Sequence, residues 1–360
     1  MRAKVRRHSR KSGHPCGRAA SALSRAGRAD REDTPVTSRD DLGDVDRHAS
    51  PEDALAELHV HIEGTLEPEL MLELAERNHV TLPHGDVDYL LSGHEFSGLQ
   101  SFLDLYYANM EVLRTAEDFS DLARGYLARA ARAGITHAEF FFDPQAHVVR
   151  GVPLEDVVEG LSDAVAVSRR EFGVDAAMIA SIVRDHPVPD AHAIFGELMR
   201  LQAPIVALGL DSAEVGYPPS LFEDVFARAR AEGLHITVHA GEEGPPEYVW
   251  QALDLLGAER IDHGIRSLED PALVERLVEE QIPLTTCPLS NVRLHVVESL
   301  SVHPLHRMLD AGLAVTINSD DPAYFGGYVD DVFAALHDEL GLTEEERKLL
   351  ARNSIRAAFT

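Results

Sequence analysis

The sequence has 360 residues, 44% of them hydrophobic, and no run approaches the roughly 18 consecutive apolar residues that a membrane-spanning helix needs. The formal net charge of -28 argues against a polyanionic partner such as nucleic acid. The two cysteines, Cys16 and Cys287, allow at most one disulfide, so a disulfide-stapled secreted fold is excluded and a reducing cytoplasm is expected.

Residues 1–50 differ in composition from the rest of the chain. They hold 12 of the 33 Lys and Arg residues but 7 of the 61 Asp and Glu residues, so this segment carries +5 and the remainder -33. It is rich in Arg, Ser and Ala and lacks apolar periodicity, which predicts a disordered basic segment. A transit peptide and a nucleic-acid-binding arm are the alternatives to a dispensable tail. The folded domain is expected over residues 51–360.

From Ala56 onward, short apolar runs alternate with amphipathic helical patterns. The predicted strands are 57–62, 136–143, 177–184, 205–211, 235–241, 260–265, 282–288 and 314–320. In the helical stretch that follows Asp270, this residue is the predicted N-cap and Pro271 takes the first helical position. Eight strand–helix repeats predict an α/β fold of the (β/α)₈ TIM-barrel type. An open doubly wound sheet is the alternative, but no glycine fingerprint follows the first strand.

The connection between the first two strands is unusually long. It spans about 70 residues, whereas one helix and two loops would need about 25. The excess contains two helical patterns and follows the carboxyl end of a strand, where barrels keep their active sites. We therefore expect residues 66–134 to supply lid helices. The alternative is an insertion that lies far from the site.

Histidine and acidic residues collect at the carboxyl ends of the predicted strands. They are His59 and His61, His239 and Glu242, His263, and Asp320 and Asp321. His59 and His61 point to the same face of their strand, because successive side chains alternate. A single histidine of this kind is more often a buried core residue than a ligand. The whole set at one end of a barrel predicts a catalytic site.

The set contains a complete group of metal ligands. Three imidazoles (His59, His61 and His239) and one carboxylate (Asp320) suit Zn²⁺ and leave room for a water, whose pKa the metal would lower towards ~7. Glu242 is close to a ligand without being needed as one, so it can donate and accept a proton. His263 and Asp321 remain to orient the attacking water and to hold the substrate. Because the three lysines lie outside the barrel, no carboxylated lysine can bridge two metals, and one zinc per chain is expected.

Several stretches in order along the chain resemble the adenosine/adenine deaminase family of metal-dependent amidohydrolase barrels. They are "ELHVHIEGTLEPEL", "FFDPQ", "GLDSAEVGYPP", "HAGEEGPP", "RIDHG", "CPLSN" and "NSDDPAYF". The resemblance runs from about residue 55 to the C-terminus. It implies that Glu242 protonates purine N1, that His263 aligns the attacking water and that Asp321 hydrogen-bonds N7. The implied reaction is hydrolytic loss of ammonia from C6 of a 6-aminopurine.

The motifs resemble most the adenine deaminase branch, which implies a free-base substrate and conversion of adenine to hypoxanthine. Glu63 stands where nucleoside deaminases have an aspartate that faces the ribose, and its longer side chain is expected to fill that space. Ser212 occupies the region whose backbone meets N3. Adenosine, N6-substituted adenines and aminodeoxyfutalosine remain alternative substrates, and a non-catalytic purine-binding protein is the other class. The chain ends at "NSIRAAFT", which predicts a short, poorly packed last helix.

Overall fold

A computed structural model describes residues 54–82 and 96–360. The predicted basic segment, residues 1–50, lies outside the described residues. Eight parallel strands are joined in the order β1 to β8. Their bounds are β1 Leu55–His61, β2 Ile135–Phe142, β3 Asp175–Val183, β4 Ile205–Asp211, β5 His235–Ala240, β6 Arg260–His263, β7 Pro283–Thr286 and β8 Ala314–Ile317. All eight predicted strands are confirmed.

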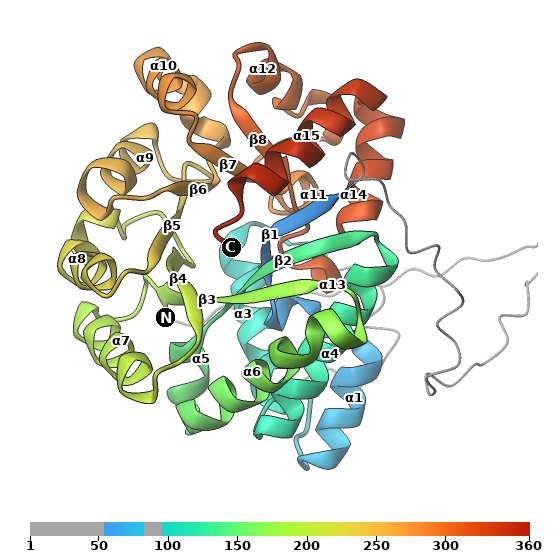
Figure 1. The fold of residues 1–360 in the computed structure, drawn as a ribbon, viewed down its shortest axis with the longest axis vertical. Coiled ribbons are helices and arrows are strands. Elements are labelled where there is room, and N and C mark those ends of the chain that lie inside the picture. Colours follow the sequence, from blue (N-terminus) through green and yellow to red (C-terminus); the bar gives the residue numbers. More distant parts are fainter. Residues whose placement is uncertain (1–53, 83–95) are drawn as a thin grey trace, which may run out of the picture. The chain divides into compact units, whose positions relative to one another are not determined.

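Main-chain contacts beyond the end of β8 complete the ring of strands. Val60 in β1 forms a parallel bridge with Asp320. The amide of His61 donates to the carbonyl of Asp320 at 2.9 Å, and the amide of Asp320 donates to the carbonyl of His59 at 3.1 Å. The strands occupy the middle of Figure 1 with helices around them, so the (β/α)₈ barrel is confirmed.

Helices follow the strands in alternation. Their bounds are α1 Pro68–Arg77, α3 Leu99–Asn109, α4 Ala116–Arg132, α5 Pro144–Val148, α6 Leu154–Glu171, α7 Val188–Leu201, α8 Glu223–Ala231, α9 Pro246–Gln251, α10 Pro271–Glu280, α11 Pro288–Arg293, α12 Leu305–Asp310, α13 Pro322–Phe325, α14 Val329–Ala335 and α15 Glu344–Ala357. Asp270 caps α10 as predicted, because its side chain accepts from the amide of Ala272 at 3.0 Å. None of the helices in the described ranges is long and apolar enough to cross a membrane.

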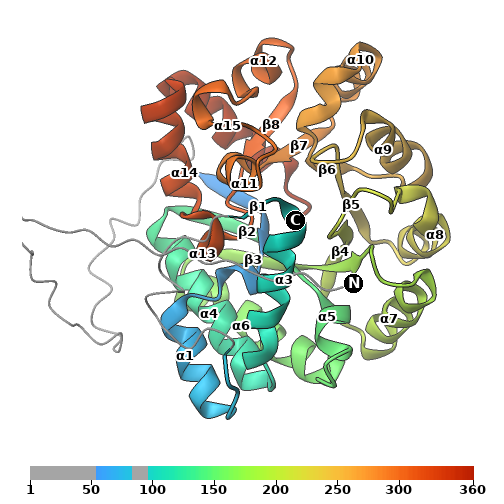
Figure 2. The ribbon, with the colours of Figure 1, turned by 180° about the vertical axis from the view of Figure 1, so that it is seen from behind.

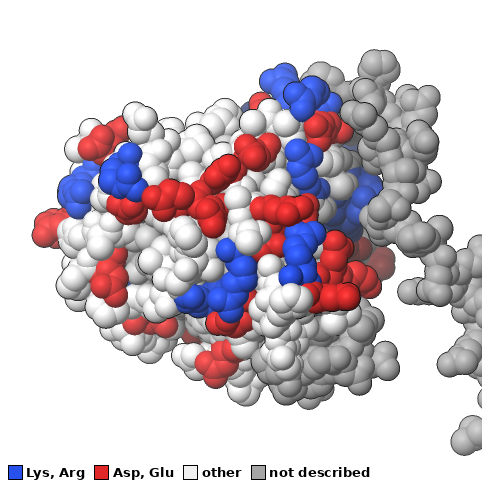
Figure 3. Space-filling model, turned by 90° about the horizontal axis from the view of Figure 1, so that it is seen from below, with Lys and Arg blue, Asp and Glu red and all other residues white. Residues whose placement is uncertain are grey.

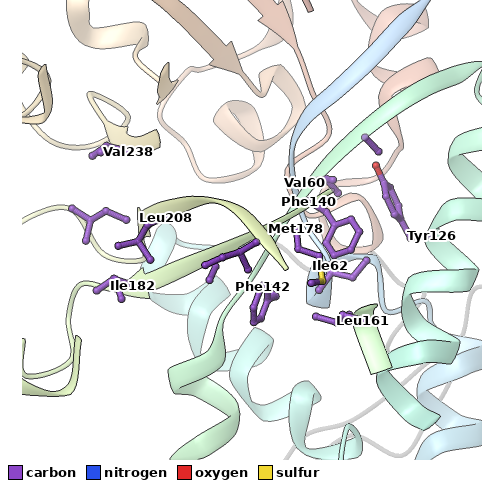
Figure 4. Close-up of a cluster of buried hydrophobic side chains, with 14 of the residues drawn as sticks. Val60, Ile62, Tyr126, Phe140, Phe142, Leu161, Met178, Ile182, Leu208 and Val238 are labelled. Carbon is purple, nitrogen blue, oxygen red and sulfur yellow. The ribbon is translucent and has the colours of Figure 1, made fainter. Parts of the chain in front are cut away.

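The main hydrophobic core lies between the strands and the helices outside them. Figure 4 shows Val60 of β1 and Phe140 of β2 close to Tyr126 of α4. His59 and His61 share the opposite side of β1, where both rings contact that of Phe141. The alternation predicted for this strand is therefore confirmed: Val60 faces the helical layer, and the two histidines face the barrel interior.

The long connection after β1 divides between two locations. Helix α4 packs against β2 and α6 as an ordinary member of the outer layer. Helix α3 instead contributes Leu99, Phe102, Leu103, Tyr106 and Tyr107 to the wall of a pocket at the strand ends. In Figure 2, α3, α11 and α13 lie in front of the strands. Of the predicted lid helices, α3 reaches the site, whereas the prediction for α4 is wrong.

The last helix is longer and better packed than predicted. Helix α15 has 14 residues and buries Leu350, Ala351, Ser354 and Ala357. It contacts β1 and β8, and the Ser354 hydroxyl accepts from the amide of Ala56 at 3.0 Å. The prediction of a short and poorly packed helix is therefore wrong.

A buried ion pair lies near the amino-terminal ends of the strands. Arg260 Nη1 donates to Glu139 Oε2 at 2.7 Å, and the amide of Phe359 donates to Glu139 Oε1 at 2.6 Å. Both charged side chains are fully buried. The outer surface is different: on the face drawn in Figure 3, acidic and basic side chains are interspersed.

Candidate active site

A pocket opens at the carboxyl ends of the strands. Most of the predicted site residues line it: His61, Ser212, His239, Glu242, His263, Asp320 and Asp321. Apolar residues of α3, with Leu294 and Phe325, cover it. The pocket therefore combines a polar floor with an apolar roof, the usual make-up of a site for a small molecule.

The four predicted metal ligands converge at the base of this pocket. One potential ligand atom from each of His59, His61, His239 and Asp320 lies within 4.8 Å of the other three. His59 Nε2 is 3.2 Å from Asp320 Oδ1, and His61 Nε2 is 3.2 Å from His239 Nε2. His59 Nε2 is buried without a hydrogen-bonding partner among the described residues. Three nitrogens and one oxygen at such spacing fit a zinc ion with a position left for water.

The opposite edges of two of these histidines are fixed by groups that the sequence analysis missed. His59 Nδ1 donates to Thr285 Oγ1 at 2.9 Å, and Thr285 Oγ1 donates to Asp262 Oδ1 at 2.8 Å. His239 Nδ1 lies 3.4 Å from Asp262 Oδ2. Such contacts hold each ring so that its Nε2 faces the metal position. Asp262 directly precedes His263 in "RIDHG", and only the strand register brings it beneath His239.

Glu242 and His263 lie side by side above the ligand set. His263 Nε2 is 3.5 Å from Glu242 Oε2 and 3.8 Å from Asp320 Oδ2. Burial raises the pKa of Glu242 well above its usual value, and the nearby charge of Asp320 adds to this rise. A carboxyl with a raised pKa can carry a proton near neutral pH and deliver it to a substrate. Asn291, the last residue of the stretch "CPLSN", has its Nδ2 3.5 Å from Glu242 Oε1.

Asp321 lies against the glycine that follows the paired histidines. A Cβ atom on Gly64 would be 2.0 Å from Asp321 Oδ1. Only glycine leaves room for the carboxyl group at this point of the pocket wall. This close approach explains why "HVHIE" is followed by glycine.

Glu63 lies outside the pocket wall, contrary to the prediction that it fills the space of a ribose. Its Oε1 accepts from the amide of Asp143 at 3.0 Å and from His147 Nε2 at 2.7 Å. The short helical turn at residues 63–65 directs the side chain towards α5, away from the cavity. Ser212 does line the pocket, with its Oγ 3.3 Å from the hydroxyl of Tyr107.

Two further carboxyl groups in the pocket wall were missed as site residues. Asp143 follows β2 and Asp211 ends β4. Both lie within the stretches "FFDPQ" and "GLDSAEVG", but neither stretch indicates that the two side chains meet across β3. Burial raises the pKa of Asp143 to about 8, and Glu63 contributes to the rise.

A sequence profile described as adenosine deaminase matches residues 54–360. An adenine deaminase of Streptomyces coelicolor is 58% identical over 314 residues, which are 86% of this chain and 92% of the relative. One from Bordetella avium is 53% identical over 305 residues, or 85% and 96% of the two chains.

Two solved structures resemble the whole barrel. Adenine deaminase from Arthrobacter aurescens has a TM-score of 0.84 and 56% identity, covering 85% of this chain and 94% of that one. An amidohydrolase from Burkholderia ambifaria with bound zinc has a TM-score of 0.79 and 29% identity, covering 85% and 86%.

Proposed function

Because this chain belongs to the adenosine deaminase family, we propose that it is a zinc-dependent hydrolase that converts adenine to hypoxanthine and ammonia. The reaction type and the substrate follow from adenine deaminases that are 50–58% identical over most of the chain. The roles of individual residues and the identity of the metal are our assignments. The observation that supports them most strongly is the convergence of His59, His61, His239 and Asp320 beneath Glu242.

The ligand set supports zinc in particular. Neutral imidazoles and one carboxylate within 4.8 Å of one another suit a borderline-soft ion in a tetrahedral site. Zinc is also the metal bound in the amidohydrolase of Burkholderia ambifaria. Bound in this position, it would supply the Lewis acidity that makes water a nucleophile at neutral pH.

The side chains above the ligand set handle the protons. Attack of water at C6 places negative charge on N1, and Glu242 neutralises that charge by donating its proton there. His263 lies between Glu242 and Asp320, where its Nε2 can orient the attacking water. Asp321, beside Gly64 in the pocket wall, hydrogen-bonds N7 and fixes the rotation of the ring. The apolar face of α3 excludes bulk water from the reacting atoms.

Ammonia release from a substrate panel tests this function. Purified protein with its metal content measured is incubated with adenine, adenosine, N6-methyladenine and aminodeoxyfutalosine. We expect about one zinc per chain and rapid turnover of adenine. An absence of ammonia release from adenine by zinc-loaded protein would overturn the proposal, and a better rate with another substrate would reassign it.

A further inference from the structure

We propose that Asp143 and Asp211 together form the subsite that accepts a hydrogen bond from N9–H of the purine. The pair would then select the free base against adenine that carries a carbon substituent at N9. This inference rests on the proposed function and extends it, because it assigns the choice between base and nucleoside to two named residues.

The two carboxyl groups line the pocket side by side, where a proton on one can be donated to the other, and this single bond uses only part of their hydrogen-bonding capacity. Both line the cavity, and Asp143 and Asp211 are only 3% and 2% exposed. Apart from this contact and the Ser181 hydroxyl beside Asp211, Asp143 Oδ1 and both side-chain oxygens of Asp211 have no hydrogen-bonding partner among the described residues. A buried polar group without a partner costs about 1–3 kcal/mol, so such atoms at a pocket wall indicate a ligand that supplies the missing donor.

The pair is held rigidly and close to the reacting end of the site. Glu63 accepts from the Asp143 amide and from His147, and Arg150 Nη2 donates to His147 Nδ1 at 2.6 Å. On the other side, Asp211 Oδ2 is 3.7 Å from Nδ1 of the metal ligand His61. Glu63 therefore acts on the substrate indirectly, by fixing the loop that carries Asp143.

Three atoms of adenine already have partners in the proposed function, which leaves one edge of the ring without a partner. C6 lies at the metal position, N1 faces Glu242 and N7 faces Asp321. The remaining polar atoms of the ring are N3, an acceptor, and N9–H, a donor. A pair of carboxyl groups that shares one proton keeps oxygens that can accept from N9–H, whereas a nucleoside has a carbon there and would leave these buried oxygens unpaired.

A separate observation supports recognition of the N3 and N9 edge of the purine by this wall. The hydroxyl of Tyr106 in α3 is buried without a partner among the described residues, and the side chain, only 3% exposed, lines the same pocket. A hydroxyl can donate to N3. The wall thus offers acceptors from Asp143 and Asp211 together with a donor from Tyr106, which matches the N9–H and N3 pair of a free purine.

The decisive comparison is between adenine and 9-methyladenine, which lacks the N9 proton and is otherwise the same base. For the unmodified enzyme we expect kcat/KM to favour adenine by about 10⁴–10⁵-fold, the discrimination typical of sites built around a substrate N–H. Asp143→Asn and Asp211→Asn should each lower kcat/KM for adenine while zinc stays bound. Each should also lower the ratio of kcat/KM for adenine to kcat/KM for 9-methyladenine at least tenfold. Asp185→Asn changes a nearby acid that is absent from the pocket wall, and it should leave the ratio unchanged.

Each outcome of this experiment distinguishes the inference from the function on which it rests. Normal adenine turnover with similar turnover of 9-methyladenine by the unmodified enzyme would overturn the subsite and leave the deaminase intact. An unchanged ratio in folded Asn variants would also overturn it. If the Asn variants lose metal because His61, Asp143 and Asp211 bind a second ion, metal analysis will show more than one ion per unmodified chain, which would contradict the proposal. No turnover of adenine at all would overturn both.

Discussion

Asp262 Oδ2 lies 3.4 Å from Nδ1 of His239, on the side of the ring opposite the nitrogen that is 3.2 Å from His61 Nε2. The same carboxylate accepts from Thr237 Oγ1 at 2.7 Å and from Thr285 Oγ1 at 2.8 Å. One buried acid therefore orients two histidines, His239 directly and His59 through Thr285. If these histidines bind zinc as proposed, their rings are already fixed, so binding would cost little reorganisation.

Replacing Asp262 by Asn should weaken metal binding. The amide keeps the shape of the carboxylate but loses the charge that favours Nδ1–H on His239, and changes of this kind cost about 10–100-fold in metal affinity. Metal content after dialysis against a graded series of chelator concentrations measures the effect. Glu139→Gln removes a different buried carboxylate and should leave zinc affinity unchanged. Equal zinc retention by Asp262→Asn and the unmodified protein would disprove the role.

Glu242→Gln should abolish turnover while the metal stays bound. Glutamine keeps the shape and a hydrogen-bond donor but cannot cycle a proton, and loss of general acid–base help lowers kcat by roughly 10²–10⁴-fold. KM for adenine should change little. Asp320→Asn is the contrasting change, because it alters a ligand and should lower zinc content itself. A Glu242→Gln protein that lost its zinc, or that kept near-normal kcat, would show that the assignment is wrong.

Gly64→Ala should impair adenine binding without removing the metal. The new methyl group would lie 2.0 Å from Asp321 Oδ1 and must displace this carboxyl group from its place beside N7. We expect KM for adenine to rise at least tenfold, since a misplaced hydrogen-bonding group is worth about 1–3 kcal/mol. Gly125→Ala, where an added Cβ meets nothing within 4 Å, is the matched control. Steady-state kinetics with normal KM for Gly64→Ala would contradict this reading of the glycine.

Leu103→Ala should weaken binding of the purine by removing part of the apolar roof. Leu103 of α3 is buried and lines the pocket, and burial of a leucine side chain is worth about 1.5–3 kcal/mol. KM for adenine should therefore increase roughly tenfold or more. Leu105 lies on the same helix but is absent from the pocket wall, so Leu105→Ala should leave KM unchanged. Similar KM values for the two variants would place α3 outside the binding site.

The Glu139–Arg260 pair makes the stability of the folded protein depend on pH. Burial alone would raise the pKa of Glu139, but the charge of Arg260 and hydrogen bonds from His137, Arg260 and the Phe359 amide lower it to about 2. The unfolded chain has the usual pKa of about 4.5, so the contribution is complete above that pH and is lost as the pH falls towards 2. The lowered pKa contributes about 3 kcal/mol to the free energy of unfolding at neutral pH, and about 2 kcal/mol of this contribution would be lost by pH 3.

Glu139→Gln isolates this contribution. The variant should be less stable at pH 7, because it leaves Arg260 buried without its anion. The difference in free energy of unfolding between the variant and the unmodified protein should become smaller from pH 5 to pH 3. The reason is that the unmodified protein loses the Glu139 contribution over this range, whereas glutamine does not titrate. Denaturant unfolding at several pH values measures the difference. A deficit that stays constant over this range would contradict the lowered pKa.

Strand periodicity and the convergence of the four proposed metal ligands could be predicted, because the first depends on local sequence and the second on the strand ends. His59 and His61 share a face through simple alternation, and residues at strand ends meet at one edge of any barrel. The direction of Glu63 could not be predicted, because a short helical turn after the strand rotates it away from the cavity. Asp143, Asp211 and Asp262 were missed because their neighbours come from other strands. Their roles depend on register and on distances that no single motif contains.

The pocket has a floor and a roof with separate origins in the chain. The floor is built from side chains at the strand ends, whereas much of the roof belongs to α3, within the long connection between β1 and β2. Helix α4 of the same connection packs against β2 and α6, so only the part that carries α3 can be exchanged with limited disturbance of the barrel. Grafting the α3 segment from a relative with another substrate range would be a direct way to engineer new specificity onto the same strand-end side chains.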